Sequence, residues 1–298
     1  MENHLIENWK NRGVSENSVK LYLFQLRQLN GGELENVEFL RDVSKVLKQL
    51  DKYKPSTIRT KIISIIACLK TMDEPELLKE YADIVKKIND NTDNTTKSES
   101  QEKNWMSKEQ VIELWKKYND EVNLFKTKKK ITEKQHEILL QFMILSLYLL
   151  ISPRRNADYG LMKIVKKMSP DLSNEFNYLD LKTRRFIFNN YKTKKTYAQQ
   201  TEDIPDELWA VIKTYLKYHS KECDFFLCID GKPLPHTNSI TLILNKIFGK
   251  KVACSMLRNI MATNDLQAVQ PLLDQVKQKA EEMGTSVSAL LNNYIKRS

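Results

Sequence analysis

The stretch ILLQFMILSLYLLISPRRNADYG, residues 138–160, joins the most apolar run of the chain to a pair of arginines. Its apolar part is about 14 residues long, which is too short to cross a bilayer and predicts a buried helix over residues 136–151. Pro153 should end this helix, because proline cannot continue the helical hydrogen-bonding pattern. Arg154 and Arg155 follow at once, and a charge beside a buried helix is costly unless it has a partner.

The composition indicates a mostly helical protein with room for two domains. The chain has 298 residues, of which 41% are hydrophobic, and only seven glycines and eight prolines. So few turn-forming residues favour helices over a fold with many tight turns. The formal net charge of +10 favours an anionic partner, nucleic acid before a membrane surface, although solubility alone could also account for it.

Residues 1–90 are predicted to form a helical domain. Ser15 is a suitable N-cap for a helix whose apolar residues recur at helical spacing. A second helix, within residues 56–72, places Lys and Arg between its apolar positions, so that one face can be buried while the other meets an anion. Residues 91–104 contain no aliphatic side chain and are interpreted as a flexible polar linker.

Residues 105–298 are predicted to form a second, mainly helical domain that includes a small antiparallel β-sheet. Ser107 and Gln110 have the spacing of a capping box before its first helix. Short strand-like pieces between residues 176 and 205 would supply the sheet. The chain returns to helical spacing from Ser239 onward.

The cysteines give no sign of a metal centre in the sequence. They form no CxxC pair and no Cys/His spacing typical of zinc: Cys68, Cys223, Cys228 and Cys254. They are interpreted as reduced thiols of an intracellular protein. The N-terminal stretch lacks an apolar signal region, and no glycine-rich phosphate loop occurs. We therefore expect neither secretion, nor a metal, nor a nucleotide cofactor.

Two polar segments carry residues suited to phosphate chemistry. Arg155 stands three residues before Asp158, and arginine binds phosphate through two charge-assisted hydrogen bonds. A surface turn with an ordinary Arg–Asp pair would have the same sequence. The second segment is a lysine-rich turn that could enter a DNA groove, although most such turns are merely solvated: Lys192, Lys194 and Lys195.

Two further candidates lie near the C-terminus. Arg258 occurs in an apolar helical stretch, where an arginine more often belongs to a core salt bridge than to a catalytic site. Tyr294 follows Gly284 by ten residues on the last predicted helix. A tyrosine on an amphipathic helix is usually a packing residue. Each of these features is weak alone, and only their order along the chain is informative.

This order resembles that of the tyrosine recombinase, or phage-integrase-like, family. The family pattern is an arginine with an acidic residue three positions later, a hairpin lysine, a second arginine, and a tyrosine ten residues after a glycine. The matching residues are, in order, Arg155 with Asp158, Lys192, Arg258, and Tyr294 after Gly284. The helical first domain and the linker also resemble the family's core-binding domain, so the resemblance covers nearly the whole chain. The first box is closest in style to recombinases of eukaryotic mobile elements and large DNA viruses.

The resemblance implies that DNA strands are cut and rejoined without a metal or ATP, as by an integrase. Arg155 and Arg258 would neutralise the phosphate oxygens and stabilise the transition state. Tyr294 would attack the phosphorus and hold the 3′-phosphate covalently. Lys192 would protonate the leaving 5′-oxygen.

Two positions depart from the family pattern. Ser255 stands where the family usually has a histidine before the second arginine, and Thr285 stands where it has one after the glycine. A hydroxyl group can donate a hydrogen bond to phosphate but is a poor general base near neutral pH. Losing such an acid–base group typically costs roughly 10²–10⁴-fold in rate, so a slow enzyme is expected in preference to an inactive one.

The resemblance also implies double-stranded DNA as the partner, bound by a homotetramer on two sites, and no membrane. The expected DNA contacts are basic residues of the helical domain and of the lysine-rich turn: Arg59, Lys61, Lys194 and Lys195. The protein would act where its DNA lies, in the nucleus or a viral replication compartment. Two other interpretations stay open: a DNA-binding accessory protein with an eroded active site, and a helical adaptor for acidic partners.

Overall fold

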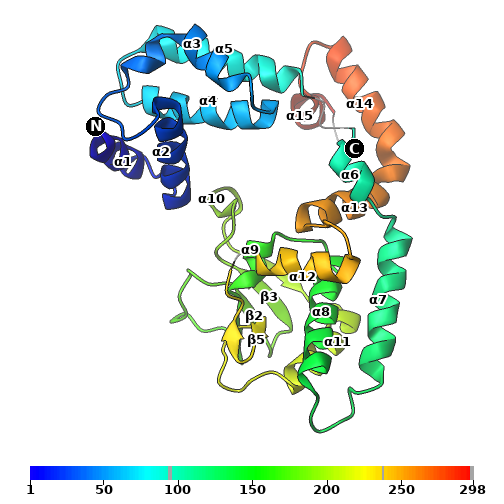
Figure 1. The fold of residues 1–298 in the computed structure, drawn as a ribbon. Helices are drawn as coiled ribbons and strands as arrows, with labels where there is room; N and C mark the ends of the chain where they lie inside the picture. Colours follow the sequence, from blue (N-terminus) through cyan, green and yellow to red (C-terminus); the bar gives the residue numbers. More distant parts are fainter. Residues whose placement is uncertain (93–95, 237, 296–298) are drawn as a thin grey trace. The chain divides into compact units, whose positions relative to one another are not determined.

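The computed structural model describes residues 1–92, 96–236 and 238–295. The chain is mainly helical and divides into two compact units, Met1–Lys97 and Ser98–Ser298 (Figure 1). Each unit has its own hydrophobic core, as expected for a chain of this length. No described helix is long and apolar enough to cross a membrane.

The first unit is helical throughout its described elements. These are α1 (Glu2–Asn11), α2 (Glu16–Asn30), η1 (Glu38–Arg41), α3 (Val43–Leu50), α4 (Pro55–Leu69) and α5 (Pro75–Asp90). Ser15 caps α2 by accepting a hydrogen bond from the backbone N–H of Ser18, as its position predicts. Helix α4 packs between α2 and α5, and its apolar face meets Trp9 and Tyr81 in the core of this unit.

The predicted flexible linker, residues 91–104, is helical in its second half. Helix α6 (Glu99–Asn104) begins with a capping box in which Ser98 and Gln101 bond each other's backbone N–H groups. The buried amide of Asn104 also accepts a hydrogen bond from the backbone N–H of Lys251. The expectation of a wholly flexible linker was therefore wrong for this part, because local capping outweighs its polar composition.

Helix α8 (Glu133–Leu149) is the centre of the second unit. Every residue from Leu139 to Tyr148 is buried, which confirms the buried helix predicted from the apolar run. The helices around it are α7 (Lys108–Asn123), α11 (Asp206–Lys217), α12 (Ser239–Phe248) and α13 (Cys254–Leu266) (Figure 1). The capping box predicted at Ser107 and Gln110 is present at the start of α7.

A four-stranded sheet packs beside these helices. Its strands are β1 (Lys163–Val165), β2 (Tyr178–Asp180), β3 (Arg185–Phe188) and β4 (Gln200–Asp203), in that order across the sheet. The last three pair in antiparallel fashion, as predicted, but β1 pairs with β2 in parallel. The sheet is thus mixed, and the purely antiparallel prediction was wrong, because a three-residue strand leaves no alternating pattern in the sequence.

Three short elements complete the connections that matter for the site. Helix α9 (Asn156–Gly160) follows the arginine pair, and helix α10 (Lys194–Tyr197) lies in the connection between β3 and β4. Strands β5 (Cys228–Ile229) and β6 (Lys232–Pro233) form a small hairpin after α11.

The C-terminal segment is a series of short helical elements: η2 (Gln267–Val269), α14 (Gln270–Glu282), α15 (Val287–Ala289) and the π-helical turn η3 (Leu290–Tyr294). Gly284 ends α14 with a positive φ of 61°. The backbone N–H groups of Gly284 and Thr285 bond the carbonyls of Glu281 and Ala280, which is the Schellman arrangement. Gly284 is therefore required by the turn itself.

Candidate active site: an arginine-lined pocket

A pocket of about 500 Å³ opens where the segment after α8 meets the β3–β4 connection and helix α13. It brings together two arginines that are far apart in the sequence, Arg155 and Arg258. The residues that line it are Ser152, Pro153, Arg154, Arg155, Asp158, Tyr191, Thr193, Tyr197, Gln200, Thr201, Glu202 and Arg258. Both arginines that the sequence selected thus face the same space.

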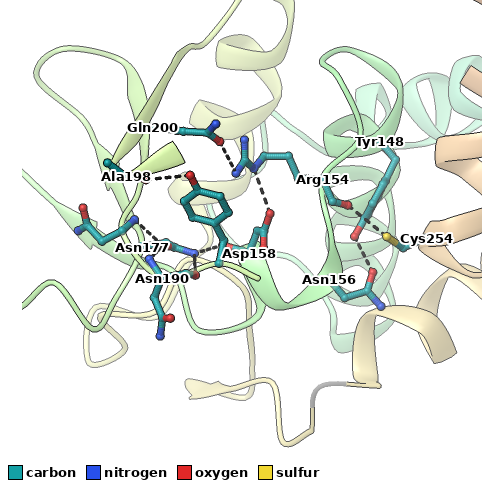
Figure 2. Close-up of polar contacts among 11 residues, drawn as sticks. Tyr148, Arg154, Asn156, Asp158, Asn177, Asn190, Ala198, Gln200 and Cys254 are labelled. Carbon is teal, nitrogen blue, oxygen red and sulfur yellow. Dashed lines mark hydrogen bonds and ion pairs between the residues drawn. The ribbon is translucent and has the colours of Figure 1, made fainter. Parts of the chain in front are cut away.

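Arg154 is a structural residue of this pocket. Its Nε donates to Asp158 Oδ2 over 3.1 Å, and its Nη2 donates to Gln200 Oε1 over 3.1 Å. Its guanidinium also lies 3.7 Å from the ring centroid of Phe188, a distance at which cation and ring attract each other. Figure 2 shows Arg154 held between Asp158 and Gln200. The side chain is therefore fixed on three sides.

The acidic partner was assigned to the wrong arginine by the sequence analysis. Asp158 forms its ion pair with Arg154, not with Arg155. The reason is local: Arg155 is the N-cap residue of α9, whereas Arg154 is four residues before Asp158 and folds back over the first turn of that helix. Arg155 is half-buried, and its side chain forms no hydrogen bond or ion pair with any described residue.

The second arginine comes from α13. Residues on one side of this helix, Met256 and Ile260, enter the core, and Arg258 is half-buried at the pocket. No described residue forms a hydrogen bond or an ion pair with its guanidinium, so the alternative of a core salt bridge is not what this fold contains. The Cys254 thiol donates to the backbone carbonyl of Arg154 over 3.1 Å (Figure 2) and thereby joins α13 to the arginine pair.

Asn177 connects α9 to the turn that follows β3. Its Nδ2 donates to the carbonyls of Asp158 and Asn190, and its Oδ1 accepts from the backbone N–H groups of Asn189 and Asn190. Figure 2 shows this amide between the two segments. Because all of its hydrogen-bonding capacity is used while it is buried, Asn177 fixes α9 against the turn that carries the pocket residue Tyr191.

Two carboxyl groups in the pocket have altered acidity. Burial raises the pKa of Asp158, and the nearby Arg154 only partly opposes this effect. One Asp158 oxygen, Oδ1, is buried without a hydrogen-bond partner among the described residues. Burial also raises the pKa of Glu202, again opposed by Arg154. The pocket therefore disfavours negative charge on its own carboxyl groups Asp158 and Glu202.

The lysine-rich turn lies at the edge of this pocket. Lys192 is exposed and does not line the pocket, but its two sequence neighbours, Tyr191 and Thr193, do. Lys194 and Lys195 are exposed on α10, and Lys194 Nζ donates to Asn190 Oδ1 over 3.0 Å. The turn is thus placed where a lysine could reach a ligand of the two arginines.

Besides Lys192, three predicted catalytic residues do not line the pocket. Ser255 is exposed in the first turn of α13, and Thr285 is half-buried in the Schellman turn. Tyr294 ends η3 with 58% of its surface exposed. The single chain therefore joins the arginines but not the proposed nucleophile.

Several residues that line the pocket could not be selected from the sequence, and two of them, Tyr197 and Glu202, carry chemically active groups. Tyr197 ends α10, is 61% exposed and faces the same space as the arginines. Glu202 lies on β4, where it is half-buried. The only sequence signal for Tyr197 was its place directly after the lysine-rich turn, and no spacing rule singles out Glu202.

The expected DNA contacts of the first unit lie on α4 and differ from one another. Arg59 is exposed, and its Nε donates to Asn89 Oδ1. Lys61 is only 2% exposed. Its Nζ donates to Gln25 Oε1 and Gln28 Oε1, each over 2.7 Å. The prediction that Lys61 contacts DNA was wrong, because its ammonium group is used inside the unit, where burial lowers its pKa.

Comparison with known proteins gives no further guide to the activity: the sequence matches no protein-family model and no curated protein. The functional assignment therefore depends on the residues of the pocket and on their arrangement.

Proposed function

We propose that this protein is a DNA strand transferase of the tyrosine recombinase type, which cuts and rejoins DNA through a 3′-phosphotyrosyl intermediate. One observation carries the proposal: Arg155 and Arg258 line one pocket, and neither guanidinium is paired with a described residue. Two half-buried guanidinium groups that face one pocket without a paired carboxylate among the described residues form a favourable site for an anion. A phosphodiester, with two non-bridging oxygens, fits two arginine forks.

The residues would share the reaction as follows. The Tyr294 oxygen attacks phosphorus, its proton passes to water, and the bond from phosphorus to the 5′-oxygen breaks. Lys192, at the pocket edge, gives a proton to the leaving 5′-oxygen. Arg155 and Arg258 stabilise the charge that develops on the phosphate oxygens. Rejoining is the reverse, so the phosphotyrosyl bond conserves the energy of the broken bond.

Tyr294 does not line the arginine pocket of its own chain, so the proposed reaction requires it to enter such a pocket by another route. We place it in the pocket of a neighbouring copy within the DNA-bound tetramer, which would sit on two DNA sites. Support comes from the C-terminal segment, where α14 packs chiefly on its neighbours η2 and α15. This segment exposes several large apolar side chains, which favour burial against another chain: Leu272, Leu273, Leu291, Tyr294 and Ile295.

DNA would be held by exposed basic residues at the pocket edge and on the first unit, with Lys194, Lys195 and Arg59 as the proposed contacts. Most contacts of this kind are made to phosphates, which position a protein without reading the sequence. The net charge of +10 supports this proposal, and the affinity should fall steeply as the salt concentration rises, because the release of counterions then becomes less favourable. The protein would act wherever its DNA substrate lies, in the nucleus or a viral replication compartment.

A second candidate function is DNA binding without catalysis, on the same scaffold. It is favoured by Tyr294 lying outside the pocket lining and by the exposed position of Ser255. Such a protein would be an accessory or architectural factor, and it would retain salt-sensitive binding.

The experiment that separates these functions is a trapping assay. Nicked DNA that carries candidate element-end sequences is incubated with the protein, and denaturing electrophoresis then detects a covalent protein–DNA adduct. We expect an adduct with the parent chain and with Tyr197→Phe, the matched control, and none with Tyr294→Phe. DNA binding with no adduct from any of the three chains would support the accessory function.

An adduct that persists in Tyr294→Phe and disappears in Tyr197→Phe would keep the strand-transfer proposal but move the nucleophile to α10. Tyr197 is a realistic competitor because it already lines the arginine pocket.

A further inference from the structure

The connection between α11 and β5 gathers a histidine and two cysteines. A ring nitrogen of His219 and the Sγ atoms of Cys223 and Cys228 all lie within 4.8 Å of one another. Cys228 Sγ is 3.3 Å from His219 Nε2. Both thiols are buried, with 8% of Cys223 and 1% of Cys228 exposed. None of the three residues lines the arginine pocket, so the cluster is separate from the proposed strand-transfer site.

These separations fit a tetrahedral zinc site. With Zn–S bonds of about 2.3 Å and Zn–N bonds of about 2.0–2.1 Å, tetrahedral angles put a sulfur and a nitrogen ligand about 3.6 Å apart and two sulfur ligands about 3.8 Å apart. The 3.3 Å from Cys228 Sγ to His219 Nε2 is close to the first value. Cys223 Sγ lies within 4.8 Å of both other ligand atoms. Binding of an ion would therefore need to shorten these two separations by about 1 Å at most.

The hydrogen bonds of His219 also point to a cation. Its Nδ1 lies 2.9 Å from the carbonyl oxygen of Ser220, and its Nε2 lies 2.8 Å from the carbonyl oxygen of Phe225. A neutral imidazole has one N–H group, so it can donate to only one of these two oxygens. If Nδ1 donates to Ser220, the lone pair on Nε2 can accept from the Cys228 thiol but lies only 2.8 Å from the Phe225 oxygen, which repels it. A metal ion bound by Nε2 and this oxygen would replace the repulsion by coordination, and a backbone carbonyl that accepts from Nδ1 is a common partner of a metal-bound histidine.

We propose that His219, Cys223 and Cys228 bind a structural Zn²⁺ ion. His219 contributes Nε2, and both cysteines bind as thiolates, so that two thiol protons are released to solvent as the ion enters. The fourth ligand is the Phe225 carbonyl oxygen, 2.8 Å from His219 Nε2 and 3.8 Å from Cys223 Sγ, or a water molecule. The sequence did not indicate zinc because the spacing His-x₃-Cys-x₄-Cys is unusual and because the loop fold alone brings Cys228 back to His219.

The ion would stabilise the wall that carries the first arginines. The loop between Cys223 and Cys228 bonds the edge strand β1: Ile164 N–H donates to the Asp224 carbonyl, and Phe226 N–H donates to the Met162 carbonyl, each over 2.7 Å. Strand β1 directly follows α9 and the arginine pair. Cys228 also lines a cavity of about 570 Å³, together with Tyr218 and Ser220, which gives the ion a path to the site.

The test uses the full-length chain, purified under reducing conditions. Zinc content is measured by elemental mass spectrometry, and the metal-free chain is titrated with Co²⁺, whose thiolate complexes absorb by charge transfer. We expect one Zn²⁺ per chain in the parent and in the control variant Cys68→Ala, which removes a buried cysteine of the other unit. The double variant Cys223→Ser/Cys228→Ser should lose both the zinc and the cobalt absorption band. Removal of zinc should lower the Tm by at least about 5 °C.

Three results would overturn the site. One is a metal-free parent that takes up no Co²⁺ with thiolate absorption. Another is equal zinc content in the parent and the double variant. The third is a Cys223–Cys228 disulfide in the native chain, seen by mass spectrometry as the loss of two hydrogen atoms. The milder variant Cys223→Ser, which keeps two ligands, should weaken Co²⁺ binding at least about tenfold, which keeps the test valid if the double variant does not fold. Failure here leaves the strand-transfer proposal untouched.

Discussion

At the scale of single residues, Arg154 and Arg155 are neighbours with different surroundings. Arg154 is held by Asp158, Gln200 and the Phe188 ring, whereas Arg155 faces the pocket with no ion-pair partner among the described residues. The sequence predicted that Arg155 would bind phosphate and that Asp158 would be its partner, whereas Asp158 pairs with Arg154. That choice depends on where α9 begins, and helix boundaries are the least certain feature of a sequence.

The arginines should therefore respond differently to substitution. Arg155→Ala and Arg258→Ala should each lower the single-turnover rate of DNA cleavage by about 10²–10³-fold, since each removes a donor to the transition state, with little change in thermal stability. Arg154→Ala should lower the free energy of unfolding by about 3–5 kcal/mol, because it leaves the buried Asp158 unpaired. Cleavage kinetics and denaturant melts measure the two effects. Equal loss of stability in all three variants would contradict this division.

Glu202 should make the second unit sensitive to pH. Because burial raises the pKa of Glu202, the folded chain binds its proton more tightly than the unfolded chain does. The resulting stability is present below the ordinary carboxyl pKa and is lost as the pH rises through the raised pKa. Glu202→Gln should therefore increase the Tm near neutral pH, and the gain should vanish in acid. A Tm–pH series tests this, with exposed Glu207→Gln as the control, whose Tm should follow that of the parent.

At the scale of the elements, the sequence predicted helices better than it predicted what their polar residues do. The caps at Ser15 and Ser107 and the buried helix α8 are present, because caps and long apolar runs are local signals. Helix α4 was also expected, yet Lys61 turned out to be an internal residue. Lys61 is buried because its ammonium group bonds Gln25 and Gln28 on α2. These partners are more than 30 residues away in the sequence, so no spacing rule could identify them.

Helix α4 gives a matched pair of substitutions. Lys61→Ala should lower the free energy of unfolding by about 1–3 kcal/mol, because it leaves the buried amide of Gln25 without its donor. It should not change the salt dependence of DNA binding. Arg59→Ala, on the exposed side, should do the opposite and reduce the slope of log K against log salt by about 1. Binding titrations at several salt concentrations, with melts beside them, check both. A reduced slope in Lys61→Ala would show that α4 contacts DNA through another face.

The small elements were the least predictable. Strand β1 has three residues and pairs in parallel, and helix α6 lies in a segment with a linker composition. Both are stabilised by contacts from elsewhere: β1 by β2 and by the loop after α11, and α6 by the bond from Lys251 to Asn104. Such tertiary contacts leave no periodic pattern in the sequence.

At the scale of the whole molecule, the proposal requires more than one chain. The arginine pocket and Tyr294 belong to the same unit, but Tyr294, at the end of η3, does not line that pocket. The sequence predicted the order of the candidate residues, and the fold unites Arg155 with Arg258 while leaving Tyr294 exposed. An assembly on DNA that exchanges C-terminal segments would complete each pocket. Sequence alone could not predict this, since it depends on surfaces and not on spacing.

Mapping the trapped adduct is the most direct test of strand transfer through Tyr294. The adduct formed on nicked DNA is digested with nuclease and trypsin, and mass spectrometry locates the residual nucleotide on the peptide. Trypsin separates the two candidates, because residues 280–296 contain Tyr294 and residues 196–213 contain Tyr197. We predict a nucleotide attached to Tyr294 through its 3′-phosphate. A nucleotide on Tyr197, or on neither peptide although the DNA is bound, would contradict the assignment of Tyr294 as the nucleophile.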